Sequence, residues 1–383
     1  MKKKFDRKKL IGVLAIVIAA IFFVSGALSL AGTIGFNMNM QYALKQSKVQ
    51  NNGLTPDIDG LGYYAFTKNA QKNFRILQLT DTHIGGGFMS IGKDRKAMTA
   101  ITKLVNYTKP DLIIITGDMV YPVPIQSGSA NNRKTTQLLC ALMDSFEIPW
   151  TVTFGNHDEE WYSLFGKEDI CQVYESSKYC IFQRGPKNIS GMGNTFINIK
   201  NPDQSMNTSL VLIDSNSYLT NTKLNVYDKI HKDQIDWYKQ ELYRIKEHYQ
   251  LHDLPPSLAF FHIPLNEYED AWKAYKNGDP DVIYHYGDAL ENVYPPAVRG
   301  EFFDAILELG STKGVFCGHD HVNGFSVTYK GVRLTYGKSI DYLAYFGTYK
   351  GFPKMTAQRG GTVIEIDNQS NFTVEPVKLD DIM

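Results

Sequence analysis

The sequence contains little cysteine and no excess charge of either sign. Four cysteines in 383 residues are too few for a fold that relies on a disulfide framework. Basic and acidic side chains number 40 each, but residues 1–36 carry six of the basic ones and one of the acidic ones, which leaves 34 against 39, or about −5, for the rest. Net charge would therefore not draw that part to a long polyanion such as nucleic acid. With 43% apolar residues, the chain is long enough for one large globular domain with a substantial core or for two smaller ones.

The cysteine positions leave one question open. Cys171 and Cys180 are close enough in sequence to pair across a short loop, or they are two free thiols in a partly buried segment. Cys317 lies in an apolar stretch, which predicts a place in the core.

Charge is also missing from a long stretch near the N-terminus. Residues 10–30 are uncharged, and the next charged side chain after Lys9 is Lys45. An apolar helix of this length spans roughly 30 Å, the thickness of the hydrocarbon core of a bilayer. The basic residues before it predict that residues 1–36 form a cytoplasmic tip and a transmembrane anchor, with the rest of the chain outside the cell membrane. The alternative is a signal segment cleaved near residues 29–31, which would leave a secreted protein.

The remaining chain divides into two regions. Residues 37–70 are polar and show no clear periodicity, so we expect a stalk. Residues 71–383 are expected to form the folded domain. Inside that domain, the segment 267–298 and the stretch 342–352 are rich in aromatic residues. Each is expected either to cover a substrate as a lid or to pack its rings against the domain.

Apolar runs and periodic segments alternate along the domain. The pattern predicts an α/β fold with parallel pairing and right-handed crossovers. Helices are predicted at 93–107, 134–146 and 232–249, where apolar residues recur at spacings of three and four. Strands are predicted at 74–80, 111–116, 149–154, 209–214, 257–261, 314–317 and 361–366, and as a hairpin at 325–329 and 332–336.

Five short polar motifs follow the ends of predicted strands, where open α/β sheets place their ligand sites. They are Asp-Thr-His at 81–83, Gly-Asp at 117–118, Gly-Asn-His-Asp at 155–158, His262, and Gly-His-Asp-His at 318–321. One cleft can therefore collect all five. Within the first and last motifs, ligand-type residues two apart face the same side of an extended segment. Each motif alone is weak evidence, whereas all five in this order form a strong pattern.

The donor atoms in these motifs are those of a transition-metal site. Candidate ligands are Asp81, His83, Asp118, Asn156, His262, His319 and His321. Imidazoles mixed with carboxylates and one amide suit manganese, iron, zinc or cobalt and disfavour calcium, which prefers oxygen alone. Asp118 can bridge two cations through its two oxygens. Two ions about 3.5 to 4 Å apart would lower the pKa of a shared water and clamp the oxygens of a displacement at phosphorus.

Two residues of the third motif are predicted to act in catalysis. The nucleophile would be a metal-bound hydroxide, and His157 is placed to stabilise developing charge and to protonate the leaving oxygen. Asp158 is expected to orient His157.

With these motifs, the sequence resembles the calcineurin-like metallophosphoesterase superfamily from about residue 74 to residue 366. More narrowly, residues 261–268 and 314–323 are similar to the subgroup of the yeast Dcr2 phosphatase and its plant purple-acid-phosphatase relatives. The resemblance implies four layers, with two mixed sheets packed face to face and helices outside. It also implies one metal held by Asp81, His83, Asp118 and His321, and a second held by Asp118, Asn156, His262 and His319.

One departure concerns Tyr121, which has the spacing of the tyrosine that ligates ferric iron in purple acid phosphatases. Those enzymes carry glycine where this chain has His83, so Tyr121 is not expected to be a ligand.

The sequence as a whole predicts an exported, membrane-anchored phosphoesterase that uses two transition metals to hydrolyse a small phosphomonoester or phosphodiester. A nuclease-type phosphodiesterase and a non-catalytic extracellular binding or sensor domain are the alternatives. Retention of His157 beside all seven ligands argues against the binding domain, because a binder needs no general acid.

Overall fold

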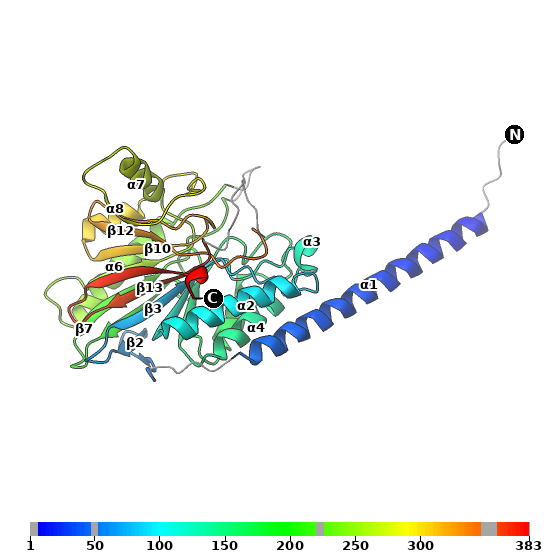
Figure 1. Ribbon diagram of the computed structural model, residues 1–383, viewed down its shortest axis with the longest axis horizontal. Helices are drawn as coiled ribbons and strands as arrows, with labels where there is room; N and C mark the ends of the chain where they lie inside the picture. The colour runs from blue at the N-terminus through cyan, green and yellow to red at the C-terminus, as the bar shows by residue number, and fades with distance from the viewer. Residues whose placement is uncertain (1–6, 47–52, 220–225, 346–357, 383) are drawn as a thin grey trace.

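Two mixed β-sheets lie face to face, with helices on both outer surfaces (Figure 1). The structure is a computed structural model that describes residues 7–46, 53–219, 226–345 and 358–382. Parallel and antiparallel pairs occur in both sheets. The predicted α/β class with two mixed sheets is therefore confirmed.

The larger sheet has nine strands in the order β1-β2-β6-β7-β8-β10-β12-β11-β9. Their bounds are β1 Asp57–Ile58, β2 Tyr64–Thr67, β6 Thr195–Lys200, β7 Met206–Leu212, β8 Ser257–Phe260, β9 Ile283–Tyr286, β10 Thr312–Cys317, β11 Ser326–Tyr329 and β12 Val332–Tyr336. The smaller sheet has the order β14-β13-β3-β4-β5. Its strands are β3 Phe74–Leu79, β4 Leu112–Thr116, β5 Trp150–Thr153, β13 Gly360–Ile366 and β14 Phe372–Lys378.

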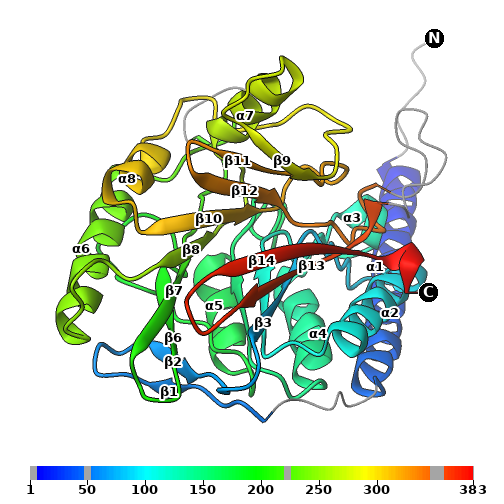
Figure 2. The ribbon, with the colours of Figure 1, turned by 60° about the vertical axis from the view of Figure 1, so that its left-hand side comes forward.

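The helices divide between the two outer faces (Figure 2). Those on the side of the smaller sheet are α1 Arg7–Leu44, α2 Ile91–Thr108, α3 Pro124–Ser127, α4 Asn132–Asp144 and α5 Lys167–Glu175. Those on the side of the larger sheet are α6 Lys232–His248, α7 Asn266–Lys276 and α8 Phe302–Leu309. A short 3-10 helix, Leu379–Asp381, follows β14.

Three apolar clusters fill the spaces between the layers. Because side chains alternate along a strand, Phe74 and Ile76 of β3 enter the cluster between the sheets, while Leu77 and Leu79 pack beneath α2 and α4. The third cluster joins the larger sheet to α6 and α8. This arrangement fixes the strand ends on which the polar motifs lie.

The predicted helices and strands of the domain are all present, with bounds within three residues of those expected. The turn of the predicted hairpin has positive φ at Lys330 and Gly331, as a two-residue hairpin turn requires. The pattern missed several elements, most of them short or partly exposed: α3, α5, α7, α8, β1, β2, β6, β9 and β14.

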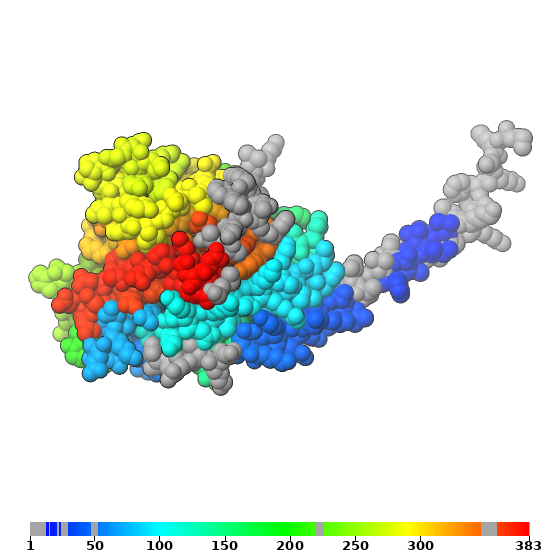
Figure 3. All heavy atoms as spheres, viewed as in Figure 1, coloured from blue at the N-terminus to red at the C-terminus, as the bar shows by residue number. Residues whose placement is uncertain are grey.

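The N-terminal segment differs from the prediction. Helix α1 runs past the apolar stretch to Leu44, and its C-terminal part lies along α2 and α4 while its N-terminal part extends away from the domain (Figures 1 and 3). Among the described residues, no helix combines the length and the apolar character needed to cross a membrane. The predicted transmembrane helix is therefore not supported.

Part of the segment expected as a stalk belongs to the fold. Asn39 and Ala43 of α1 are buried against the domain, and β1 and β2 extend the larger sheet. The four cysteines are free, so Cys171 and Cys180 do not pair. Cys317 is buried in β10, as predicted.

The aromatic-rich segment 267–298 mostly packs against the domain. Trp272 of α7 stacks on Phe325 at 4.5 Å between ring centroids, and Tyr275 stacks on Tyr284 at 4.7 Å. Packing therefore describes Trp272 better than a lid, whereas Tyr294 of the same segment lines a cavity together with His157 and His319. From residue 346 onward, the stretch 342–352 lies outside the described residues.

Candidate dinuclear metal centre

The five polar motifs meet where strands of the two sheets end. Strands β3, β4 and β5 of the smaller sheet lead to the first three motifs, and β8 and β10 of the larger sheet lead to the last two. The seven predicted ligands are all buried, with at most 9% of any of them exposed. The sheets thus converge on one polar site inside the protein.

The first group of donors consists of Asp81, His83, Asp118 and His321, whose ligand atoms lie within 4.8 Å of one another. His83 Nε2 is 3.2 Å from Asp118 Oδ2. His321 Nε2 is 3.5 Å from Asp81 Oδ1. The four residues come from the loops that follow β3, β4 and β10. Their ligand atoms are close enough together to hold one cation.

The second group consists of Asp118, His262 and His319, with Asn156 beside it. His262 Nε2 lies 3.2 Å from Asp118 Oδ2 and 3.3 Å from His319 Nδ1. The side-chain oxygen of Asn156 is 3.2 Å from the same nitrogen of His262, and its amide nitrogen donates to the Tyr218 hydroxyl. That hydrogen bond turns the carbonyl oxygen of Asn156 toward the group.

Asp118 belongs to both groups, as a bridging carboxylate of a dinuclear centre would. The residues fit two transition metals, since imidazole nitrogens and carboxylate oxygens converge without an intervening side chain. Burial opposes the charged form of His262, but the nearby Asp118 carboxylate raises the pKa of His262 to about 9. Burial and the charge of His262 hold the pKa of His319 well below its usual range. Cations bound at the two groups would neutralise the buried carboxylates.

The backbone at the site is held in a strained conformation. Asp81, His83, Asp118 and His319 have positive φ values between 45° and 79°, a region that costs non-glycine residues about 1 kcal/mol or more. Gly117 also has positive φ, and an added Cβ there would lie 2.5 Å from the ring of His262. The glycine of the Gly-Asp motif thus allows the imidazole to approach.

Further polar groups fix the orientation of the imidazoles. The backbone carbonyl of Thr116 lies 2.8 Å from His262 Nδ1, so Nδ1–H donates and Nε2 is left as the free donor atom for a metal. The carboxylate of Asp341 lies 3.3 Å from His83 Nδ1 and 3.2 Å from His321 Nδ1.

Asp341 is itself held in place by the backbone. Its carboxylate accepts hydrogen bonds from the amides of Leu343, Ala344 and Tyr345. Sequence reasoning missed Asp341, because it lies 20 residues after His321 in no recognisable motif.

The predicted catalytic histidine lies at the mouth of the site. The His157 amide donates to Asp118 Oδ1 at 2.8 Å, and its ring nitrogen Nε2 is 4.0 Å from Asp118 Oδ2. About a quarter of the side chain is exposed. His157 is therefore accessible to a ligand bound over Asp118.

The residue that orients His157 is Glu160, and the prediction for Asp158 is wrong. Glu160 Oε1 lies 2.7 Å from His157 Nδ1. The Asp158 carboxylate instead accepts hydrogen bonds from the amides of Asp118, Val120 and Gly155. These three backbone donors lie in the loops after β4 and β5, so the role of Asp158 is to fix the backbone of the second and third motifs. A carboxylate three residues after His157 was the only sequence signal for Glu160.

Tyrosines form the walls of the opening above the centre. A cavity of about 280 Å³ is lined by four of them, together with His157 and His319. These tyrosines are Tyr121, Tyr227, Tyr294 and Tyr345. The Tyr121 ring stacks on His83 at 4.9 Å.

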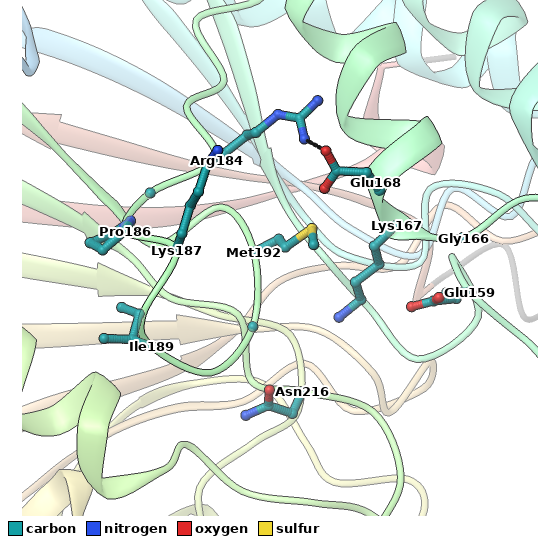
Figure 4. A pocket seen from close by; sticks show the side chains of 12 residues that line it. Glu159, Gly166, Lys167, Glu168, Arg184, Pro186, Lys187, Ile189, Met192 and Asn216 are labelled. Atoms are coloured by element: carbon teal, nitrogen blue, oxygen red, sulfur yellow. Dashed lines mark hydrogen bonds and ion pairs between the residues drawn. The ribbon is translucent and has the colours of Figure 1, made fainter.

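A larger cavity, of about 770 Å³, lies apart from the predicted ligands. Figure 4 shows Lys167 and Met192 pointing into it and Arg184 paired with Glu168. The Lys167 ammonium is bonded to Asp214 at 2.7 Å. The lining of this larger cavity does not include a residue of the two donor groups.

The four-layer fold and the two donor groups that share one carboxylate define a phosphoesterase hydrolase with a dimetal site. The chain belongs to the calcineurin-like phosphoesterases, whose family profile matches residues 74–323.

Similarity to individual proteins agrees with this family. The chain is 28% identical over 299 residues to a protein of Arabidopsis thaliana named probable inactive purple acid phosphatase 29, covering 71% of this chain and 73% of that protein. Phosphatase DCR2 of Saccharomyces cerevisiae is 28% identical over 273 residues, covering 66% of this chain and 44% of that protein. The match thus spans less than half of the yeast relative.

A solved structure also resembles the fold. A dimetal phosphatase from Danio rerio superimposes with a TM-score of 0.51 at 11% sequence identity, covering 80% of this chain and 97% of that one. At this identity the likeness concerns the fold alone.

Proposed function

We propose that this protein hydrolyses a small phosphate ester, with Asp81, His83, Asp118 and His321 holding one metal ion and Asp118, Asn156, His262 and His319 holding a second. The observation that carries the proposal is the pair of buried donor groups joined at Asp118, with His157 above them. Manganese, iron, zinc and cobalt all suit this donor set. When bound, two such ions activate a water and offset the charge of the phosphoryl oxygens.

The protein's own groups supply orientation and a proton. His157 lies next to the shared carboxylate and is held at Nδ1 by Glu160, so its Nε2 faces the place where the leaving oxygen develops charge. In the protonated form, Nε2–H donates the proton that the departing alcohol requires. The Tyr218 hydroxyl donates to Glu160 at 3.0 Å and accepts from Asn156, which links the proton donor to one ligand of the second metal.

A second candidate is a binding domain that keeps the fold without turnover. It is favoured by the word "inactive" in the name of the plant relative. The intact pair of His157 and Glu160 supports hydrolysis instead, because a metal-binding domain has no use for an oriented proton donor. Export of the domain stays a prediction that rests on the charge pattern of residues 1–36.

Activity with and without metal tests the proposal. We expect the purified chain, given Mn²⁺, to release p-nitrophenol from p-nitrophenyl phosphate or from its bis ester, and to stop when a chelator is added. No release from either ester with manganese, iron, zinc or cobalt would favour the binding domain.

Variants of the proton donor separate catalysis from metal binding. His157→Ala is expected to lower kcat by about 10²- to 10⁴-fold while the metal content measured by mass spectrometry stays the same. Glu160→Gln is expected to lower kcat in the same direction, with KM little changed. The matched controls are His252→Ala at an exposed histidine and Glu159→Gln at the neighbouring carboxylate. Wild-type turnover in His157→Ala would remove the role assigned to this residue.

A further inference from the structure

The opening above the metal centre has aromatic walls next to both donor groups. In the first group, Tyr345 lies 4.3 Å from His321 and Tyr121 lies 4.9 Å from His83, measured between ring centroids. In the second group, Tyr227 lies 4.4 Å from His319. A phosphate ester bound across the two donor groups would therefore have a tyrosine beside it at each group.

We call Tyr121 and Tyr345 the first wall and Tyr227 the second wall. The ring of Tyr227 is supported on the side away from the opening. Tyr227 stacks on Tyr218 at 5.6 Å, and the Tyr218 hydroxyl bonds both Asn156 and Glu160. The ring of Tyr227 is therefore backed by a side chain that is tied to the centre, so it forms a fixed surface. Rigid aromatic surfaces of this kind suit an apolar or planar group of a ligand.

The charges around the opening are those of carboxylates. Among the described residues that line the cavity, none is a lysine or an arginine, and Asp320 is a carboxylate besides Asp118, whose charge the bound metal ions would offset. Glu160 lies behind His157, and Glu291 accepts a hydrogen bond from the Tyr345 hydroxyl. Sites that bind the dianion of a phosphomonoester commonly use a guanidinium or an ammonium group for the additional charge. The described part of this cavity offers phenols and imidazoles instead.

We propose, on the basis of the function proposed above, that the natural substrate is a phosphodiester, with one ester arm against Tyr121 and Tyr345 and the other against Tyr227. A diester carries a single negative charge and two organic arms, whereas a monoester above about pH 6 carries two charges and one arm. The two walls match two arms, and the described lining provides no lysine or arginine to pair with the second charge of a monoester. Tyr227 and Tyr345 are specificity-determining residues in this arrangement.

Three esters with the same leaving group test the proposal on the full-length, manganese-loaded protein at about pH 8. They are p-nitrophenyl phosphate, methyl p-nitrophenyl phosphate and bis-p-nitrophenyl phosphate. We expect kcat/KM to be at least about tenfold higher for the bis ester than for the monoester, with the methyl ester between them. A monoester that is hydrolysed as well as or better than the bis ester would overturn the diester assignment and leave the phosphoesterase intact. Absence of turnover with all three would contradict the phosphoesterase itself, and the assignment with it.

Variants of the walls supply a second readout. Tyr227→Leu and Tyr345→Leu are each expected to lower kcat/KM for the bis ester at least about fivefold, mainly through KM. The monoester has a single arm, so its kcat/KM is expected to fall in one of the two variants and to change less than about twofold in the other. Tyr243→Leu, at an exposed tyrosine of α6, is the matched control. Bound manganese, measured for every variant, separates loss of an ester contact from loss of the centre. Equal losses for both esters in both variants, with the metal retained, would overturn the assignment of two ester arms to these walls.

Discussion

At the scale of single residues, Asp118 holds the two donor groups together. Its two carboxylate oxygens contact His83, His262 and the backbone of His157. The charges of these histidines hold the pKa of Asp118 well below its usual range, against the effect of burial. Asp118 is therefore an anion ready to bridge cations.

Substitution of Asp341 tests whether this carboxylate positions the metal ligands His83 and His321. Its carboxylate lies against the Nδ1 atoms of His83 and His321, which leaves the Nε2 atoms to face the first donor group. Asp341→Asn is expected to weaken Mn²⁺ binding about 10- to 100-fold, measured by calorimetric titration of metal-stripped protein. Asp253→Asn, at an exposed aspartate, is expected to bind as the wild type does. Unchanged affinity in Asp341→Asn would show that this carboxylate does not position the ligands.

The residues of the site differ in how far they could be predicted. The seven candidate ligands lie in short motifs at strand ends, and the structure brings all seven together. Glu160, Asp341 and Tyr227 were not predicted, because their contacts depend on how loops fold back over the centre. Asp158 was placed in the right motif but given the wrong partner, since sequence adjacency to His157 says nothing about which way its side chain points.

At the scale of elements, helix α1 is joined to the loop that follows the first motif. Asn39 of α1 donates a hydrogen bond of 2.9 Å to Asp94 at the start of α2. The Asp94 carboxylate also accepts from the amides of Gly85 and Gly86 and from the Ser90 hydroxyl. Docking of α1 therefore supports the loop that leaves the metal centre.

A substitution on α1 tests this link. Asn39→Ala removes a buried hydrogen bond to a carboxylate and is expected to lower the free energy of unfolding by about 1 to 2 kcal/mol, measured by urea denaturation. Asn37→Ala, two residues earlier and exposed on the same helix, is expected to change it by less than about 0.5 kcal/mol. Equal effects of the two substitutions would contradict the docking of α1 through Asn39.

The same carboxylate predicts a pH dependence. Burial raises the pKa of Asp94 to about 6, above its usual value of 3.8. The folded chain then binds this proton more tightly than the unfolded chain, so Asp94 makes folding more favourable as the pH falls through about 6 toward 4.

Comparison with Asp94→Asn isolates this contribution. Between about pH 7.5 and pH 5, in the presence of chelator, the stability of the wild type relative to Asp94→Asn is expected to rise by on the order of 1 kcal/mol. Urea denaturation at the two pH values measures the difference. A difference that does not depend on pH, or that falls with acidification, would contradict the raised pKa.

Helices and strands with a clear apolar pattern could be predicted from the sequence. Those stabilised by packing against neighbouring elements could not. Strand β4 reads as an unbroken apolar run, and α2 shows a clear apolar stripe. Strand β14 lies at the open edge of the smaller sheet and has one buried residue, Val374, among exposed and half-buried ones, so its sequence carries little apolar pattern. The C-terminal part of α1 was predicted to be a stalk because the region from residue 37 is polar and shows no clear periodicity, although Asn39 is buried there and bonded to Asp94.

At the scale of the whole molecule, the two sheets bring together loops from opposite halves of the sequence. Asp81 follows β3 in the smaller sheet, and His319 follows β10 in the larger one, yet the His319 amide donates to the Asp81 carboxylate. The fold class could be inferred from the alternation of strands and helices together with the family resemblance. The register of one sheet against the other, which places tyrosines beside both donor groups, depends on packing that no local pattern records.

Anomalous diffraction from crystals of the manganese-loaded protein tests the dinuclear centre most directly. We predict two manganese peaks about 3.5 to 4 Å apart, with Asp118 contacting both, His83 and His321 on one ion, and His262 and His319 on the other. A single peak, or two peaks that do not share Asp118, would contradict the dinuclear centre.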